Sequence, residues 1–290
     1  MNVLARFVAL ITRRFYPRGM QRMLRLLFNP KKMHIQTVVP YDRTLKINVD
    51  TSSYVEWELF FRGYYEKWVI DVIKKLVHEG DVAVDAGANI GTHTLILAKL
   101  VGASGGVFAF DPDPKSVKRL TENITLNHLT HVKILQSGLS DKEGSIRLFS
   151  YGNEMLDQGT ASLYELPKLH KTSIEVPVQT LDRFVQHEGV RRFDFIKIDT
   201  RGSDFPIIRG ARKTIEKFRP HIIFEYNRDN WERSHSQWED AKTFFDANNY
   251  LLYLVDQKGA HFIEQATDAK TSYNILAIPK EKLSAIKLHE

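Results

Sequence analysis

The sequence contains no cysteine. Disulfide bonds, thiolate metal sites and cysteine nucleophiles are therefore excluded for this chain. No apolar run approaches the roughly 20 residues that a membrane-crossing helix requires, and no segment resembles a cleavable signal peptide. We therefore expect a cytoplasmic protein. With 43% apolar residues in a length of 290, the chain is long enough to bury the core of one large α/β domain.

Acidic residues are missing from the first 33 positions, whereas eight basic residues occur there. They are Arg6, Arg13, Arg14, Arg18, Arg22, Arg25, Lys31 and Lys32. Subtracting these eight from the 41 basic residues of the chain leaves 33 against 35 acidic residues, a balance of about −2. Because nucleic-acid-binding domains usually carry a basic face across the whole domain, we do not expect nucleic acid as a partner.

The basic segment, residues 1–35, has the pattern of an amphipathic helix pair. Apolar residues recur at helical spacing in residues 3–11 and 20–27, and Pro17 and Gly19 separate the two runs. Basic amphipathic helices suit anionic membrane surfaces, so we hypothesise peripheral contact with the inner face of the membrane. The alternative is a helix pair that packs on the catalytic core or on a second subunit of a homo-oligomer.

Three further segments predict local structure. Residues 36–49 consist of two strand-like runs around a turn at 40–43, which predicts a hairpin at one edge of the domain or one side of the site. Residues 52–76 predict a helix with a mostly buried aromatic face. Apolar and alternating runs in residues 250–279 predict antiparallel strands that complete a sheet.

The most informative stretch covers residues 82–98. A short apolar run ends in Asp85, a loop of small residues follows, and a helical pattern begins at Thr92. This strand–turn–helix pattern typically opens a parallel α/β sheet. Gly87 permits a sharp turn with a ligand against bare main chain, and Gly91 allows the helix to begin close to the strand. A plain structural turn could show the same pattern, but we favour a ligand site.

Two substitutions separate this loop from the dinucleotide-binding motif G-x-G-x-x-G. Asn89 and Thr92 stand at its second and third glycine positions, which disfavours a pyrophosphate. Asp85 would repel a diphosphate and suits a positively charged ligand, such as the sulfonium and ammonium of S-adenosylmethionine. A second acid, Asp111, ends the apolar strand of residues 107–110, where a carboxylate can accept hydrogen bonds from both ribose hydroxyls.

Four motifs resemble, in order and spacing, those of the FkbM family of S-adenosylmethionine-dependent methyltransferases. They are VDAGANIG, AFDPDP, FDFIKIDTRGSDFPIIRGA and PHIIFEYN, within roughly residues 60–280. The resemblance implies an α/β, class I methyltransferase (Rossmann-like) fold, a doubly wound mixed sheet of seven strands, over residues 36–290. It also implies methylation of hydroxyl groups on sugars or polyketides.

The resemblance further implies where the cofactor binds. Tyr65 and Glu66 match a Tyr-Glu pair that the family often has at this distance before the glycine loop. Glu66 could bind the ammonium of the cofactor, or it could be a solvated helix residue. Residues 137–141 follow the third predicted strand, where the adenine ring would lie. Ser140, Asp141 or a nearby backbone N–H could bind the adenine edge.

Carboxylates at two strand ends are the candidates for catalysis. The apolar strand of residues 193–198 ends in Asp199, and the next strand ends in Glu225. Such carboxylates face the ligand crevice of an open α/β sheet. Because a neutral alcohol is a poor nucleophile, Asp199 or Glu225 could act as general base or orient a sugar diol. A divalent metal on Asp199, Asp204 and Glu225 could polarise the hydroxyl instead, but spacing alone assigns no metal ligand.

The third motif departs from the family pattern at one position. Arg201 stands where the family usually has an acid, whereas Asp204 keeps the acid at the end of the motif. If the missing acid were the base, this protein would be impaired or would use another group. Arg201 could instead pair with a phosphate or carboxylate, so we hypothesise an anionic or lipid-linked acceptor. His93, in the first helical turn, could face the acceptor or could cap or pack the helix.

The sequence therefore predicts an S-adenosylmethionine-dependent O-methyltransferase that acts on a hydroxyl of a sugar or related polyhydroxylated acceptor. One alternative is a nicotinamide-dependent sugar oxidoreductase, which the glycine loop disfavours. Another is a non-catalytic cofactor-binding scaffold that degenerated at Arg201 and acts through its basic segment. Turnover of candidate acceptors distinguishes the enzyme from the scaffold.

Overall fold

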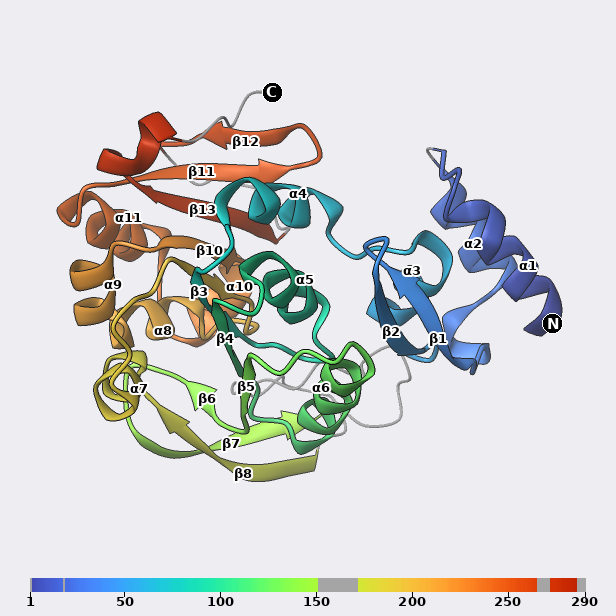
Figure 1. Cartoon of the computed structure of the whole chain (residues 1–290), viewed down its shortest axis with the longest axis horizontal. Helices are drawn as coiled ribbons and strands as arrows, with labels where there is room; N and C mark the ends of the chain where they lie inside the picture. Colours follow the sequence, from blue (N-terminus) through green and yellow to red (C-terminus); the bar gives the residue numbers. More distant parts are fainter. Residues whose placement is uncertain (1, 18, 151–171, 265–271, 286–290) are drawn as a thin grey trace.

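The computed structural model describes residues 2–17, 19–150, 172–264 and 272–285. These residues form a central eight-stranded sheet, a smaller three-stranded sheet and an N-terminal hairpin, with helices around them (Figure 1). In spatial order, the central strands are β12 (Gly259–Phe262), β11 (Tyr250–Asp256), β13 (Tyr273–Pro279), β10 (His221–Tyr226), β9 (Phe195–Ile198), β3 (Val82–Ala86), β4 (Gly106–Phe110) and β5 (Val132–Leu135).

The direction of these strands divides the central sheet in two. β10, β9, β3, β4 and β5 are parallel, whereas β13, β11 and β12 are antiparallel. The chain passes outward from β3 to β5, then returns to β9 on the other side of β3, so the strand order reverses between β3 and β9. This topology confirms the predicted doubly wound mixed sheet. The expected number of seven strands was wrong, because β12 pairs with β11 and extends that edge.

Helices cover both faces of the central sheet (Figure 1). On one face lie α4 (Lys67–Leu76), α5 (Thr92–Val101) and α6 (Pro114–Leu126); on the other lie α7 (Leu181–Glu188), α8 (Asp204–Gly210), α9 (Arg212–Phe218), α10 (Arg228–Arg233) and α11 (Trp238–Ala247). Each face of the sheet has its own hydrophobic core. Because successive strand residues point to opposite faces, Ala83 packs in the core on the side of α4, α5 and α6, and Val84 packs in the core on the side of α7 to α11. The 3₁₀ helix η2 (Lys280–Ala285) follows β13.

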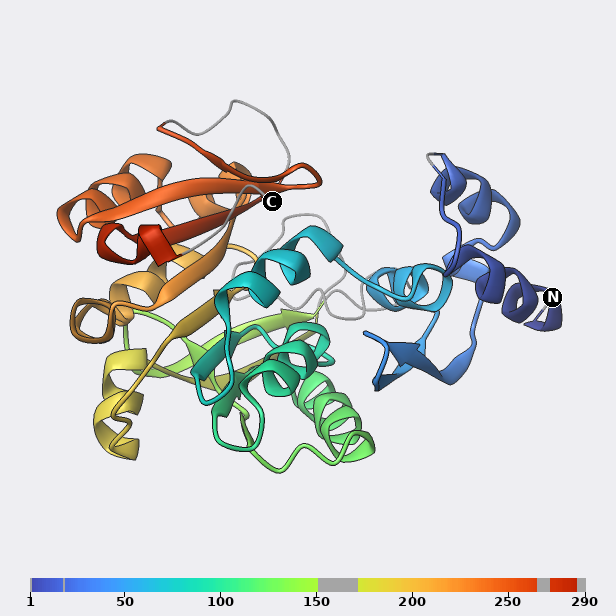
Figure 2. The same ribbon diagram turned by 45° about the horizontal axis from the view of Figure 1, so that its top comes forward.

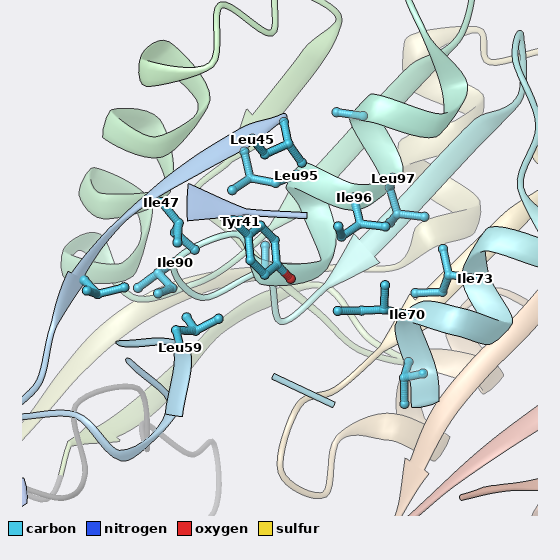
Figure 3. Packing of buried hydrophobic residues seen from close by; sticks show 14 of the residues in the cluster. Tyr41, Leu45, Ile47, Leu59, Ile70, Ile73, Ile90, Leu95, Ile96 and Leu97 are labelled. Carbon is cyan, nitrogen blue, oxygen red and sulfur yellow. The ribbon is translucent and has the colours of Figure 1, made fainter. Parts of the chain in front are cut away.

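The hairpin expected from the sequence is present. Strands β1 (Gln36–Tyr41) and β2 (Leu45–Asp50) pair antiparallel, and their apolar side chains pack beside Leu95 of α5 (Figure 3). The Tyr41 hydroxyl donates to the Thr92 carbonyl at 2.8 Å. The hairpin therefore supports the start of α5 from outside the central sheet.

The predicted continuous helix over residues 52–76 was wrong. The structure has two helices there, α3 (Tyr54–Arg62) and α4, with Gly63 in the left-handed conformation at the end of α3. The φ of +78° at Gly63 ends the helix. The break releases Tyr65 and Glu66 from regular helix and brings Tyr65 to the pocket wall described below.

The basic segment contains the two predicted helices, α1 (Asn2–Thr12) and α2 (Met20–Leu27), followed by the 3₁₀ helix η1 (Pro30–Lys32). Figures 1 and 2 both place α1 and α2 at one end of the molecule. Ala5, Ala9 and Leu24 are buried in the same core cluster as the hairpin. Among the described residues, no helix combines the length and apolar character needed to cross a membrane.

A three-stranded sheet borders the end of β5. It consists of β6 (Gly138–Leu139), β8 (Thr172–Gln179) and β7 (Gly144–Ser150), in that order. The sequence Thr180-Leu181-Asp182 is typical of a helix start with Thr180 as the cap, and the Thr180 side chain does cap α7 by accepting from the Arg183 N–H at 3.2 Å. Between β7 and β8, the sequence pattern predicts a loop over residues 151–169, and this segment lies outside the described residues.

Candidate active site

A pocket lies at the C-terminal ends of β3, β4 and β9, beside the point where the strand order reverses. Four segments supply most of its wall: the β3–α5 loop, the turn after β4, the β5–β6 connection and the β9–α8 loop. Tyr65 and Val55 close it from the side of α3. In doubly wound sheets ligands bind at this place, so the pocket is the candidate active site.

Two glycines shape the β3–α5 loop by permitting close approach. Gly87 has a φ of +86°, and a Cβ atom there would lie 2.0 Å from the Asp199 carbonyl oxygen. Gly91 has a φ of +95°, and its Cβ would lie 2.6 Å from Leu120 Cδ1 of α6. Each glycine therefore lets the loop pack against neighbouring protein. Both Gly87 and Asn89 also line the pocket.

Asp111 joins the glycine loop to the turn after β4. Its carboxylate accepts from the Asn89 N–H at 2.8 Å and from the Asp113 N–H at 2.9 Å. Burial raises the pKa of Asp111 to about 7, although both N–H groups oppose this shift. Each carboxylate oxygen can still accept a second hydrogen bond, and Asp111 lines the pocket. Its position fits the predicted ribose contact.

Asp199 and Glu225 come from neighbouring strands, because β9 pairs with β10. Lys197 of β9 is completely buried, and its Nζ lies 3.4 Å from Asp199 Oδ2. Burial alone would raise the pKa of Asp199, but the Lys197 ammonium outweighs it and lowers that pKa. Burial, Asp199 and Asp204 raise the pKa of Glu225 to about 8. Asp199 lines the pocket, whereas Glu225 is not among its lining residues.

Glu66 lies close to His93 and Asp199, two residues that line the pocket. Glu66 Oε1 accepts from Asn274 Nδ2 at 3.0 Å, and Glu66 Oε2 lies 3.7 Å from His93 Nε2. Burial and Asp199 raise the pKa of Glu66 to about 7. Burial and Lys197 lower the pKa of His93 to about 3, so its imidazole is neutral at physiological pH. Ligand atoms of these three side chains lie within 4.8 Å of one another, close enough to hold a cation.

Two acids predicted for the site lie behind its wall. Asp85 accepts from Thr94 Oγ1 at 2.5 Å and is 1% exposed. Asp204 is completely buried and accepts from the N–H groups of Thr200 and Gly202 at 3.3 and 3.1 Å. Neither residue lines the pocket. Their geometry favours a role in holding the two loops in shape, and any contribution to chemistry would be electrostatic.

Ser140 and Asp141, predicted near the adenine ring, also do not line the pocket. The Ser140 N–H donates to the Gln179 carbonyl at 3.0 Å, and Asp141 accepts from Arg209 Nη2 at 2.7 Å. Residues 137–139, immediately before them, line the pocket instead. Ser140 and Asp141 thus lie just beyond the wall, and the adenine contact in this connection stays a prediction.

Arg201 lies in the pocket wall and is exposed. Its φ of +53° is the left-handed conformation, which is uncommon for a residue other than glycine and is frequent at functional sites. Within the described parts of the chain, its guanidinium makes no hydrogen bond or ion pair. Arg201 is therefore available to a ligand in the pocket.

Three residues of this region were not predicted from the sequence. Thr200 and Ser203 line the pocket, and their buried hydroxyls find no hydrogen-bond partner in the described residues. Lys197 neutralises part of the carboxylate cluster. The sequence could have indicated Lys197, because it lies inside the apolar run FDFIKI and a buried lysine almost always has a charged partner.

Comparison with known proteins gives one family match. The model of the "Methyltransferase FkbM domain" matches residues 85–252. The hexuronic acid methyltransferase AglP of Haloferax volcanii is 30% identical over 155 residues, covering 52% of this chain and 58% of AglP. The 2-O-methyltransferase NoeI of Sinorhizobium fredii is 25% identical over 171 residues, covering 54% of this chain and 67% of NoeI. The chain thus spans little more than half the length of AglP.

Among solved structures, the methyltransferase FkbM from Methylobacillus flagellatus is similar with a TM-score of 0.45 and 17% sequence identity. The match covers 68% of this chain and 43% of that one.

Proposed function

This chain belongs to the FkbM methyltransferase family, and on that premise we propose that it transfers a methyl group from S-adenosylmethionine to a hydroxyl of a sugar or related polyhydroxylated acceptor. The names of AglP and NoeI describe methyl transfer, to hexuronic acid in the first and to a 2-hydroxyl in the second. Neither name describes oxidation or reduction, so the nicotinamide-dependent alternative gains no support.

One observation carries the proposal: carboxylates line the pocket at the point where the strand order reverses, or lie directly behind its wall. Asp111 fits a ribose, and residues 137–139 with Phe110 offer a partly apolar wall for an adenine. Asp199 lines the pocket and Asp85 lies behind its wall, and both would favour the cationic methionine portion of the cofactor. A diphosphate would meet the same carboxylates and be repelled.

Asp199 is the base in this proposal. The hydroxyl oxygen of the acceptor forms a bond to the methyl carbon as the carbon–sulfur bond breaks, leaving S-adenosylhomocysteine. The hydroxyl proton passes to Asp199, which is ionised at neutral pH because Lys197 lowers its pKa. Glu225, with its raised pKa, is mostly protonated there and does not line the pocket, so Asp199 is the better placed of the two carboxylates to act as base.

Arg201 points to an acceptor with an anionic group. A guanidinium binds a carboxylate or phosphate through two parallel hydrogen bonds. The acceptor named for AglP, a hexuronic acid, carries a carboxylate. We therefore place acidic sugars first among the candidate acceptors of this chain.

We also propose that the helix pair α1 and α2 binds an anionic membrane surface, which would bring the enzyme to a lipid-linked acceptor. Val3 and Leu10 of α1 are 83% and 66% exposed, and Leu26 of α2 is 80% exposed. Exposed arginines accompany them, including Arg14 and Arg22. Apolar exposure next to basic charge is typical of helices that lie in a membrane interface.

Liposome co-sedimentation tests the membrane proposal. Vesicles with anionic lipid should bind the wild type and release it at high salt, and the double variant Leu10→Glu, Leu26→Glu should stay in the supernatant. Equal behaviour of both proteins would contradict the proposal. A dimer in solution that the same variant dissociates would assign the surface to a second subunit.

Methyl transfer is tested with isotope-labelled S-adenosylmethionine and a panel of glucuronosides, galacturonosides and neutral hexosides. Incorporation of label into a uronoside by the wild type, and its loss in Asp199→Asn, is the expected result. Absence of transfer to every acceptor, in a protein that still binds the cofactor, would favour the non-catalytic scaffold.

A further inference from the structure

We propose that Glu66, His93 and Asp199 form a binding site for a divalent transition-metal ion at the edge of the methyl-donor pocket. The three residues come from different elements: Glu66 precedes α4, His93 lies in the first turn of α5, and Asp199 follows β9. Their ligand atoms lie within 4.8 Å of one another. The inference rests on the proposed function, because the ion would face the acceptor of that reaction.

Two of the three ligand atoms are buried and have nothing to bind. His93 is 5% exposed, and neither His93 Nε2 nor Glu66 Oε2 has a hydrogen-bond partner among the described residues. A buried polar atom without a partner is costly and calls for an explanation such as an ion. The other Glu66 oxygen accepts from Asn274 Nδ2, which orients the carboxylate as outer partners of metal ligands commonly do.

The separation of His93 and Glu66 suits a metal better than an ammonium. Imidazole and carboxylate ligands lie about 2.0–2.2 Å from Zn²⁺, so ligand atoms around such an ion are about 3–4 Å apart. Acceptors around an ammonium, at about 2.8 Å from nitrogen, would be about 4.6 Å apart. His93 Nε2 and Glu66 Oε2 are separated by 3.7 Å.

Charge also favours a divalent ion. Among the described residues, the carboxylates of Glu66 and Asp199 share this region with one buried ammonium, that of Lys197. A neutral imidazole is the form that binds metal, and burial keeps His93 neutral. One imidazole and two carboxylates suit ions such as Mn²⁺, Fe²⁺ or Zn²⁺. Three protein ligands leave positions at which an acceptor hydroxyl could bind and lose its proton more easily.

Titration of the full chain with Mn²⁺, followed by electron paramagnetic resonance in the absence of cofactor, tests the site. We expect one bound ion per wild-type chain and at least a tenfold weaker affinity in His93→Gln and in Glu66→Gln. Glu225→Gln is the matched control, because it removes a neighbouring carboxylate outside the three ligands and should retain the ion.

Calorimetry with S-adenosylhomocysteine on the same proteins separates this inference from the proposed function. His93→Gln should bind S-adenosylhomocysteine as wild type does while failing to bind Mn²⁺. No stoichiometric Mn²⁺ binding by the wild type, or equal binding by both ligand variants, would overturn the metal site. Stoichiometric displacement of Mn²⁺ by S-adenosylhomocysteine would also overturn it, because Glu66 would then belong to the cofactor's ammonium. Loss of S-adenosylhomocysteine binding alone would count against the proposed function.

Discussion

At the residue scale, the contact with Lys197 distinguishes Asp199 from Glu225 as the candidate base. The sequence alone left that choice open. Asp199 and Glu225 end adjacent strands and share one environment of low solvent access. Lys197 Nζ lies beside Asp199 and lowers its pKa, whereas burial, Asp199 and Asp204 raise the pKa of Glu225. Opposite shifts of neighbouring acids are typical of sites that divide acid and base roles.

The pH dependence of the reaction follows from this difference. A base must be ionised, and Asp199 remains ionised well below neutral pH because its pKa is lowered. We expect kcat/KM to be constant from about pH 6 to about pH 8.5, and Asp199→Asn to lower kcat by roughly 10²–10⁴-fold. A rate that rises with an apparent pKa near 8, and loses that rise in Glu225→Gln, would instead identify Glu225 as the base.

Arg201 gives a second prediction at this scale. Arg201→Ala should raise KM for a uronoside by roughly 10–100-fold, since hydrogen bonds to charged groups contribute about 1.5–3 kcal/mol. Affinity for S-adenosylhomocysteine and KM for a neutral hexoside should stay within about twofold, if any neutral hexoside is accepted. Arg201→Lys keeps the charge but not the paired donors, so an intermediate KM is expected. Equal losses with charged and neutral acceptors would contradict the proposed carboxylate contact.

At the scale of elements, the β3–α5 loop depends on the end of β9. The Gly87 N–H donates to the Phe110 carbonyl at 2.9 Å, while the missing Cβ leaves space for the Asp199 carbonyl. The close approach of Gly87 to the Asp199 carbonyl therefore positions the β3–α5 loop against the end of β9 that carries Asp199. A change that separates them would disturb cofactor and acceptor sites together.

Gly87→Ala tests that contact. The new Cβ would clash with backbone and the residue would keep a positive φ, so we expect a loss of more than about 2 kcal/mol in unfolding free energy. Gly189→Ala is the matched control, because Gly189 also has a positive φ (+62°) but nothing lies within 4 Å of its Cβ position. It should cost about 1–2 kcal/mol. Urea denaturation of both variants makes the comparison, and equal losses would refute the close-approach argument.

Elements set by local pattern were predictable, and those set by distant contacts were not. The hairpin, the βα unit at residues 82–98 and the Thr180 cap follow from nearby residues, and all three are present. The break after α3 was missed because the aromatic face continues across Gly63. Ser140 belongs to the connection expected near the adenine ring but does not line the pocket, and its N–H donates to the Gln179 carbonyl of β8, a contact between distant segments that spacing does not predict.

At the scale of the whole molecule, the fold brings several carboxylates together at the candidate site without an equal number of buried positive charges. Glu66 lies more than a hundred residues before Asp199 and Glu225 along the chain, so the clustering of the three depends on the sheet order and could not be derived from spacing. The doubly wound sheet was expected only from the resemblance to the FkbM family. The neutral state of His93 and the charge partners of Lys197 depend on side chains from other strands and loops, so they follow only from the three-dimensional structure.

This concentration of acids predicts how stability depends on pH. Four acids have folded-state pKa values raised to about 7 or 8: Glu66, Asp111, Asp204 and Glu225. The folded chain then binds more protons than the unfolded chain above about pH 4, so stability is lost as pH rises through these values. His93 and His221 have lowered pKa values, so stability is also lost as pH falls below about 6.5.

We therefore expect the melting temperature to decrease from about pH 6 toward pH 8.5, because above about pH 6.5 the histidines no longer titrate and the four acids still hold extra protons in the folded chain. S-adenosylmethionine supplies positive charge, so the rise in melting temperature that it causes should be larger at pH 8.5 than at pH 6. Thermal scans with and without cofactor at both pH values measure this. A ligand effect that is larger at pH 6 would show that the carboxylates do not carry the binding.

Calorimetric titration with S-adenosylhomocysteine and with NAD, on the wild type, Asp111→Asn and Asp111→Ala, tests the central claim most directly. We predict micromolar binding of S-adenosylhomocysteine by the wild type, a marked loss in both variants, and no heat from NAD. Binding of NAD without binding of S-adenosylhomocysteine would contradict the assignment of this pocket to a methyl donor.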